Sequence, residues 1–178
     1  YGGSMKKCLI VFSLAFLIQG LVFAGGEPDE VRGKGKFNKQ EYGYSVFIPR
    51  NCTYMDWGTS LSINFGRNNE GAINGSLDIF PSKGAQEWDK AKADFYSTEI
   101  KDILKNNNSA ADETKMKKLN GMDCIIYSFS KTYEDGTKET GYTGLFKTKK
   151  GIFQLKFGCT SKSVSSSGLK MIKSIRPL

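Results

Sequence analysis

Histidine is missing from all 178 residues of this chain. Its absence excludes serine–histidine and cysteine–histidine nucleophile pairs, and it excludes most zinc sites with ordinary ligand sets. The four cysteines never occur with C-x-x-C spacing, so a thioredoxin-like redox centre is not indicated. A phosphate-binding G-x-x-x-x-G-K-S/T loop is also missing. The sequence therefore predicts no cofactor, no metal site and no enzyme activity.

Long apolar runs are also rare, and the clearest one lies near the N-terminus. Residues 1–4 resemble a remnant of an expression tag, and Lys6-Lys7 then precede the apolar run 8–18. Small Ala24 follows at a cleavage position, which is the form of a secretory signal peptide. The run is shorter than the roughly 20 residues of a spanning helix, although a retained N-terminal anchor is the alternative. We expect residues 5–24 to be removed and the protein to be periplasmic or secreted, in a bacterium.

Acidic residues are outnumbered by basic ones. The 26 basic residues include Lys6 and Lys7, so 24 remain in the mature chain against 18 acidic residues, a net charge of +6. This balance favours an acidic partner, and export makes nucleic acid an unsuitable one. Two lysine clusters stand out: Lys115, Lys117 and Lys118, then Lys147, Lys149 and Lys150. They are interpreted either as a solvated face or as a docking patch for an acidic protein or a lipid headgroup.

The mature chain reads as one α+β domain. Residues 25–36 are rich in glycine and charge and predict a flexible segment, and residues 37–178 form the domain. Alternating apolar residues predict strands, and a change to a period near 3.6 predicts one long helix capped by Ser82 or Gly84. The expected elements are strands at 40–49, 59–65, 72–80 and 111–119, the long helix at 85–106, and a short helix at 165–174.

Residues 121–159 predict three consecutive antiparallel strands. Asp135-Gly136 is typical of a two-residue hairpin turn, and Lys150-Gly151 is expected to form the second turn. This register pairs Tyr127 with Gly144 and Phe146 with Leu155. It places one apolar set on a single buried face: Ile125, Tyr127, Phe129, Tyr142, Phe146, Phe153, Leu155, Phe157 and Cys159.

Three cysteines belong to the mature chain. The expected register puts Cys124 and Cys159 on opposite faces, which argues against a bond between them. Because an oxidising compartment favours one disulfide, we predict a Cys52–Cys159 pair, with three reduced buried cysteines as the alternative.

Acidic residues offer two weaker sites. Glu134-Asp135-Gly136 has carboxylates for calcium, but a turn explains these residues fully. A hydrolase built on carboxylates such as Asp78 or Asp123 would need two of them together, and the sequence does not place them so.

The order of elements resembles the PsbP/Mog1-like α/β/α sandwiches, including the DcrB-type periplasmic proteins. The resemblance covers residues 37–178 and rests on Tyr42-Gly-Tyr-Ser-Val-Phe-Ile-Pro49, Trp88, Asn120-Gly121 and Met171-Ile-Lys-Ser-Ile175. It implies an antiparallel sheet of about six strands flanked by one long and one short helix, and mostly non-enzymatic roles. We therefore expect an exported binding or assembly module whose partner is another envelope protein. The alternatives are docking on an anionic membrane surface and an unrecognised enzyme, and the oligomeric state is not indicated.

Overall fold

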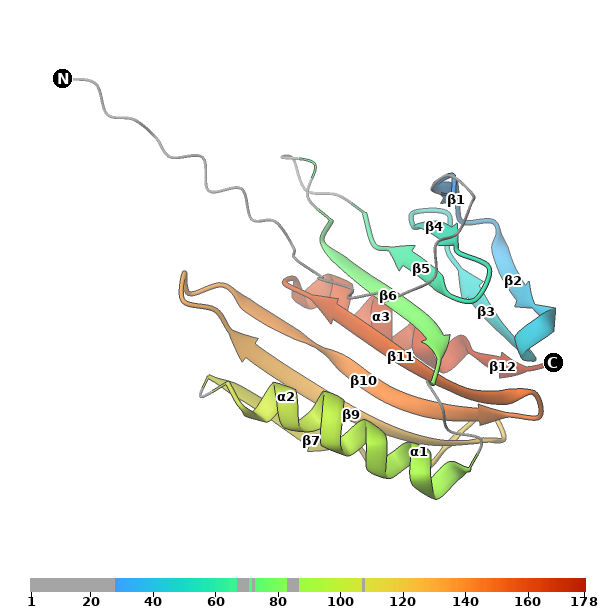
Figure 1. Ribbon diagram of the computed structural model, residues 1–178. Helices are drawn as coiled ribbons and strands as arrows, with labels where there is room; N and C mark the ends of the chain where they lie inside the picture. The colour runs from blue at the N-terminus through green and yellow to red at the C-terminus, as the bar shows by residue number, and fades with distance from the viewer. Residues whose placement is uncertain (1–27, 67–70, 72, 83–86, 107) are drawn as a thin grey trace.

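The computed structural model describes residues 28–66, 71, 73–82, 87–106 and 108–178. Twelve strands, three α-helices and two shorter helical segments follow one another along this part of the chain (Figure 1). Their bounds are β1 Val31–Arg32, β2 Gly35–Lys39, η1 Gln40–Tyr42, β3 Tyr44–Ile48, β4 Thr53–Asp56, β5 Leu61–Asn64, β6 Gly75–Pro81, α1 Trp88–Phe95, η2 Tyr96–Ile100, α2 Lys101–Leu104, β7 Ser109–Glu113, β8 Lys118–Leu119, β9 Met122–Thr132, β10 Lys138–Thr148, β11 Gly151–Cys159, α3 Lys162–Ser174 and β12 Arg176–Pro177.

The strands form two antiparallel sheets. The nine-stranded sheet has the order β1-β4-β5-β6-β11-β10-β9-β7, with β8 paired to β9, and the three-stranded sheet has the order β12-β3-β2. The α+β class is confirmed, but the strand number is well above the six expected. The prediction of a flexible N-terminal segment is wrong for its described part. Residues 28–36 contain β1 and the first residues of β2. These residues have no apolar pattern of their own, so the sequence did not indicate strands. Backbone pairing with β4 and β3 holds them in place.

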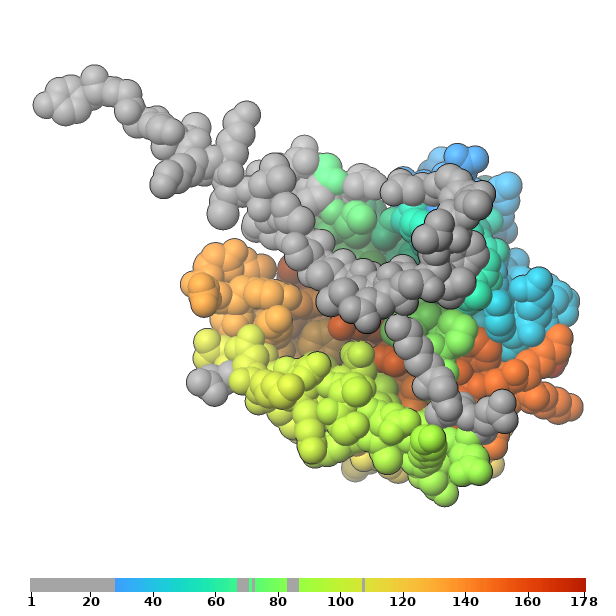
Figure 2. All heavy atoms as spheres, in the orientation of Figure 1, coloured from blue at the N-terminus to red at the C-terminus, as the bar shows by residue number. Residues whose placement is uncertain are grey.

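Helices and the small sheet cover the two faces of the large sheet. On one side, Ala91, Phe95 and Ile100 pack over Tyr127 and Leu145. On the other side lie α3 and the small sheet, and the larger apolar cluster there includes Val46, Phe157 and Ile172. Figure 2 shows the α1–α2 layer covering the first of these faces, with the β9–β10 hairpin visible beyond it. The expected α/β/α layering is confirmed.

The long helix differs in detail from its prediction. Its described part begins at Trp88 with Glu87 as N-cap, so Ser82 does not cap it, and Gly84 and the expected start at residue 85 lie outside the described residues. Residues 96–100 are π-helical and join α1 to α2. Tyr96 and Leu104, two large apolar residues of this helix, are each 46% exposed.

The β9–β10 hairpin corrects the predicted register by one residue. Tyr127 lies opposite Thr143, and Phe146 lies opposite Cys124. The cause is a three-residue loop: the Gly136 amide donates to the Tyr133 carbonyl at 3.0 Å, and Gly136 has a φ of 81°. A one-residue shift exchanges the faces of β9. Ile125 and Tyr127 therefore face the long helix, and Cys124 faces α3.

The β10–β11 hairpin differs from its prediction by two residues. Thr148 pairs with Gly151, and Phe146 pairs with Phe153 in a stacked contact with ring centroids 5.5 Å apart. A two-residue shift leaves every side chain on its expected face. Because the one-residue shift turns Cys124 over and the two-residue shift leaves Cys159 in place, the two cysteines lie on the same face of the sheet. The prediction had placed them on opposite faces.

Candidate functional site

The sheet brings the two lysine clusters of the sequence to one end of the molecule. Lys118 on β8 lies directly opposite Asp123 on β9. On the other side of β9, Phe146 pairs with Cys124, so the next residue, Lys147, borders Asp123 from β10. All three side chains are exposed. We call the set Lys115, Lys117, Lys118, Lys147, Lys149 and Lys150 the lysine-rich end.

The connection from β7 to β8 is held in place by Cys124 and Glu113. The Cys124 amide donates to the Lys117 carbonyl at 3.0 Å, and the Cys124 thiol donates to the Met116 carbonyl at 3.6 Å. Lys117 forms an ion pair with Glu113, and its hydrogen bond lowers the pKa of that carboxyl. Lys115 is exposed on the same connection. The backbone that carries these lysines is therefore fixed by the sheet.

The turn between β10 and β11 carries Lys149 and Lys150. Lys150 donates to the Gln40 carbonyl of η1, so its ammonium is turned toward the small sheet. Lys149 is exposed. Figure 1 shows this turn and the start of β9 at the same end of the sheet, beside the C-terminus. Lys150 is thus partly committed to the small sheet by this hydrogen bond.

Two further elements border the lysine-rich end. The Asn120 side chain, in the β8–β9 turn, donates to the Lys173 carbonyl of α3 at 3.0 Å. Asn120 and Gly121 both have positive φ values (51° and 90°), as the two central residues of a type I′ turn require. On the helix side, a hydrogen bond from Lys92 lowers the pKa of Asp89, and the charge of Lys147 adds to this effect.

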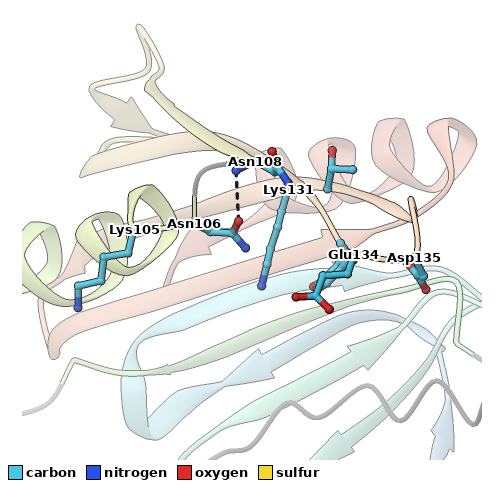
Figure 3. Close-up of a pocket in the computed structure, with 8 residues that line it drawn as sticks. Lys105, Asn106, Asn108, Lys131, Glu134 and Asp135 are labelled. Carbon is cyan, nitrogen blue, oxygen red and sulfur yellow. Dashed lines mark hydrogen bonds between the residues drawn. The ribbon is translucent and has the colours of Figure 1, made fainter.

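A polar pocket of about 670 Å³ lies at the opposite end, between the end of α2 and the β9–β10 hairpin. In the view of Figure 3, Lys131 extends between Asn106 and Glu134. Asp135, one of the two carboxylates weighed for calcium, accepts the Thr137 amide at 2.8 Å, which lowers its pKa. The described residues contain no group of three acidic or cysteine side chains placed to hold a metal. The hydrogen bond within the hairpin turn therefore explains the presence of Asp135 at this position.

A row of polar residues crosses the face of the sheet that carries the long helix. Ser62, Asp78 and Lys156 are directly opposite one another on β5, β6 and β11. Glu99, from the π-helical segment, brings its carboxylate within 3.8 Å of the Lys156 ammonium. Burial raises the pKa of Asp78, against the effects of a hydrogen bond from Ser62 and the charge of Lys156. The amide nitrogen of buried Gln154, two residues before Lys156 on β11, has no hydrogen-bond partner.

This row bears on the hydrolase considered above. The structure brings Asp78 and Glu99 to the same lysine, which sequence reasoning missed because the two carboxylates lie on different elements. Asp123 lies elsewhere, between Lys118 and Lys147. The alternation of residues along β5, β6 and β11 tells which side chains share a face, but not which strands are neighbours. The row could therefore have been predicted only if the strand order had been known.

The three cysteines of the mature chain are free, buried thiols. The predicted Cys52–Cys159 disulfide is therefore not formed, and this prediction is corrected. Cys159 instead makes sulfur hydrogen bonds to the carbonyls of Thr140 (3.5 Å) and Ser161 (3.4 Å). Burial raises the pKa of the Cys52 and Cys159 thiols, and burial with the charge of Asp123 raises the pKa of Cys124 to about 11.

Comparison with known proteins gives matches among solved structures alone. No family model and no curated protein matches the chain. The solution structure of cyanobacterial PsbP (CyanoP) from Synechocystis sp. PCC 6803 aligns with 90% of this chain and 99% of its own, at a TM-score of 0.51 and 11% identity. This chain has a PsbP/Mog1-like fold. At that identity the likeness concerns the fold and nothing more.

Two other structures are similar to this chain at a TM-score of 0.48. A Pseudomonas aeruginosa protein of unknown function shares 9% identity, over 80% of this chain and 96% of its own. A Bacteroides thetaiotaomicron VPI-5482 protein shares 19% identity over 82% of this chain, which spans about half (49%) of that longer protein. Among the helices of the described residues, none has the length and apolar character needed to cross a membrane.

Proposed function

We propose that the protein is an exported, non-enzymatic binding module of the bacterial cell envelope, which docks on an acidic surface of a partner protein. The docking surface is the lysine-rich end. The observation that carries this proposal is the pairing of β8 and β10 around β9, which sets Lys118 and Lys147 on either side of Asp123. Clustered exposed charges of this kind steer association and select an oppositely charged partner.

The rigidity of the surface supports a docking role. Cys124 and Asn120 tie the backbone of the lysine-rich segments to the sheet and to α3. A surface that is ordered before binding loses less entropy when its partner arrives. Beyond the loss of translational and rotational freedom, the entropic cost of docking is then mainly the ordering of the lysine side chains.

A protein partner fits this surface better than a lipid bilayer does. Surface-bound membrane proteins combine cationic residues with apolar side chains that enter the bilayer. The large exposed apolar residues of the described chain are Phe47, Trp57, Tyr96, Leu104, Tyr133 and Leu178. None of them lies in the segments 113–123 or 147–151. Leu178 borders the lysine-rich end, because its amide donates to the Gly43 carbonyl beside Lys150, but it is a single apolar side chain. Acidic Glu113 and Asp123 also stand among the lysines, and they would be repelled by an anionic surface.

The lack of histidine favours a non-enzymatic role, since it excludes serine–histidine and cysteine–histidine nucleophile pairs. With no histidine in the chain, Asp78 and Glu99 are the strongest titratable candidates, and Ser62 and Lys156 already engage them. Hydrolysis by the purified protein that is lost in Asp78→Asn would contradict this part of the proposal.

Export rests on the sequence of residues 5–24, which lie outside the described residues. Cell fractionation and N-terminal sequencing of the secreted protein test it. We expect a mature N-terminus at Gly25. A mature protein that keeps residues 5–24 would instead support the anchored alternative.

In-cell photo-crosslinking tests the docking surface. A photo-reactive residue at position 118 or 149 is expected to give a discrete crosslink to one envelope protein whose contact region is acidic. The same residue at position 170, exposed on α3, is the matched control and should give none. Sedimentation with vesicles that depends on anionic lipid and salt, without a protein crosslink, would favour the membrane alternative.

A further inference from the structure

A second basic site lies away from the lysine-rich end. Arg32, Lys34 and Arg50, with Gly33, line a cleft of about 370 Å³ where the β1–β2 connection meets the turn after β3. The chain has few arginines, and two of them meet here. The three basic side chains are exposed, whereas Gly33 is buried.

Close backbone contact holds the two segments of the cleft together. The Gly33 amide donates to the Cys52 carbonyl at 2.8 Å, and the Cys52 amide donates to the Pro49 carbonyl at 3.0 Å. A Cβ atom at Gly33 would lie 2.1 Å from the Pro49 carbonyl oxygen, so the approach requires glycine. This contact brings Arg32 and Lys34 against Arg50, although 18 residues separate the two arginines.

The Arg32 guanidinium is oriented by the fold. Its Nε donates to the Arg50 carbonyl at 2.8 Å. A guanidinium has five N–H donors in a fixed fork, so the two terminal NH₂ groups of Arg32 stay available. Within the described residues, none of the three cations forms an ion pair with a carboxylate.

Glu30, two residues before Arg32, turns its carboxylate toward β4 and β5. Glu30 accepts hydrogen bonds from the Thr53 hydroxyl at 2.6 Å and from the Asn64 side-chain amide at 3.2 Å. Three like charges around one cleft repel one another, and an anion bound among them reverses that cost. The cleft is thus a cationic and concave site whose backbone and Arg32 guanidinium are held by hydrogen bonds.

We infer that this cleft binds a phosphate group, carried by a small phosphorylated molecule or by a lipid headgroup. Arginine pairs recognise phosphate oxygens by two parallel hydrogen bonds from each guanidinium, and lysine adds a point charge. The volume is at the lower end of the range of about 300–1,000 Å³ for small-ligand sites. A group as small as a phosphomonoester or diphosphate fits it.

The cleft is independent of the proposed docking surface. Residues 44–48 form β3, with Gly43 before the strand and Arg50 just beyond its end. Lys150 packs beside Gly43, so the lysine-rich end and the cleft lie at opposite ends of this strand. Loss of one function therefore does not require loss of the other, and separate variants test them.

Calorimetric titration of the purified protein with inorganic pyrophosphate tests the inference. We expect saturable one-to-one binding that Arg50→Gln weakens at least tenfold. Arg50→Lys keeps the positive charge but loses the paired N–H donors of the guanidinium, and should weaken binding several-fold. Lys170→Gln, an exposed change of charge on α3, is the control and should leave the affinity within about twofold. Urea unfolding of each variant verifies that the fold is kept.

Two results would overturn the inference: titration without saturation, or equal losses in Arg50→Gln and Lys170→Gln. A wild-type affinity in Arg50→Lys would also overturn the bidentate geometry. Vesicles that contain phosphatidic acid separate the two sources of phosphate. Sedimentation with them that pyrophosphate abolishes assigns a lipid headgroup, and pyrophosphate binding without sedimentation assigns a soluble ligand.

Discussion

Lys118 and Asp123 face each other across the short pairing of β8 with β9, and Asp123 has Lys147 on its other side. Exposed opposite charges that lie near one another on a protein surface contribute little to stability, typically about 0–1 kcal/mol. We therefore attribute the arrangement to recognition. The lysine on each side of the carboxylate presents charge at the end of the sheet, where a partner can reach both.

Neutral replacement of these lysines tests that attribution. The double variant Lys118→Ala, Lys147→Ala is expected to change the free energy of unfolding by less than about 0.5 kcal/mol, because both side chains are exposed. Urea denaturation provides the measurement. A loss of about 2 kcal/mol or more would show that the lysines are structural.

Gly168 lets α3 approach the sheet. A Cβ atom at this position would lie 2.1 Å from Cζ of the buried Phe157 ring. Gly168→Ala is therefore expected to destabilise the protein by about 1–3 kcal/mol, despite the better helix propensity of alanine. Ser167→Ala, exposed in the same helical turn, is the control and should cost less than about 0.5 kcal/mol. Equal unfolding midpoints for the two variants would contradict the packing of α3.

Asp78 predicts a pH dependence of stability. Its folded-state pKa is raised above the usual 3.8, mainly by burial, so the folded protein holds this proton more tightly than the unfolded chain does. Below the pKa of Asp78 in the unfolded chain, the carboxyl is protonated in both states and its burial does not lower the free energy of unfolding. As the pH rises through the folded-state pKa the buried group becomes charged, and the resulting loss of stability persists at neutral pH. Asp78→Asn removes that cost and keeps an acceptor for Ser62.

Thermal unfolding of Asp78→Asn should thus show a gain in stability at about pH 7 that vanishes near pH 3. Asp123→Asn changes the net charge equally, but at an exposed position, and should show no such gain. If the gain were the same at both pH values, burial of the Asp78 charge would not be its cause.

We expect the three cysteines of the mature chain to be unreactive in the folded protein. Because the three thiols are buried and the pKa of Cys124 is raised to about 11, little thiolate is present near neutral pH. The secreted protein should have the same intact mass with and without reductant, and iodoacetamide should modify it only after denaturation. A mass gain on reduction would show that a disulfide had formed.

The layers of the fold could be predicted from the sequence, because burial imposes a period on the apolar residues. Leu61 and Ile63, or Leu77 and Ile79, alternate as the strands require, and they are fully buried. The hairpin register could not be predicted, since Asp135-Gly136 suits both two-residue and three-residue loops. The choice depends on Gly136 alone taking a positive φ while the Asp135 side chain accepts the Thr137 amide.

The sites were predicted less completely. Lys118 and Lys147 were identified as clustered charges, but their approach to Asp123 follows from the strand order, which local patterns do not contain. Arg32 and Arg50 escaped notice because one stands in a glycine-rich segment expected to be flexible. Their meeting depends on the Gly33–Cys52 hydrogen bond, which joins residues far apart in the chain.

The affinity of the crosslinked partner for charge-reversed variants tests the central claim most directly. Lys118→Glu with Lys147→Glu is compared with Lys162→Glu and Lys170→Glu, which make the same change of net charge on exposed positions of α3. If the lysine-rich end is the docking surface, the first pair weakens binding at least tenfold and reduces its salt dependence, and the second pair leaves it within about twofold. Equal effects of the two pairs, or no effect of the first, would contradict the account.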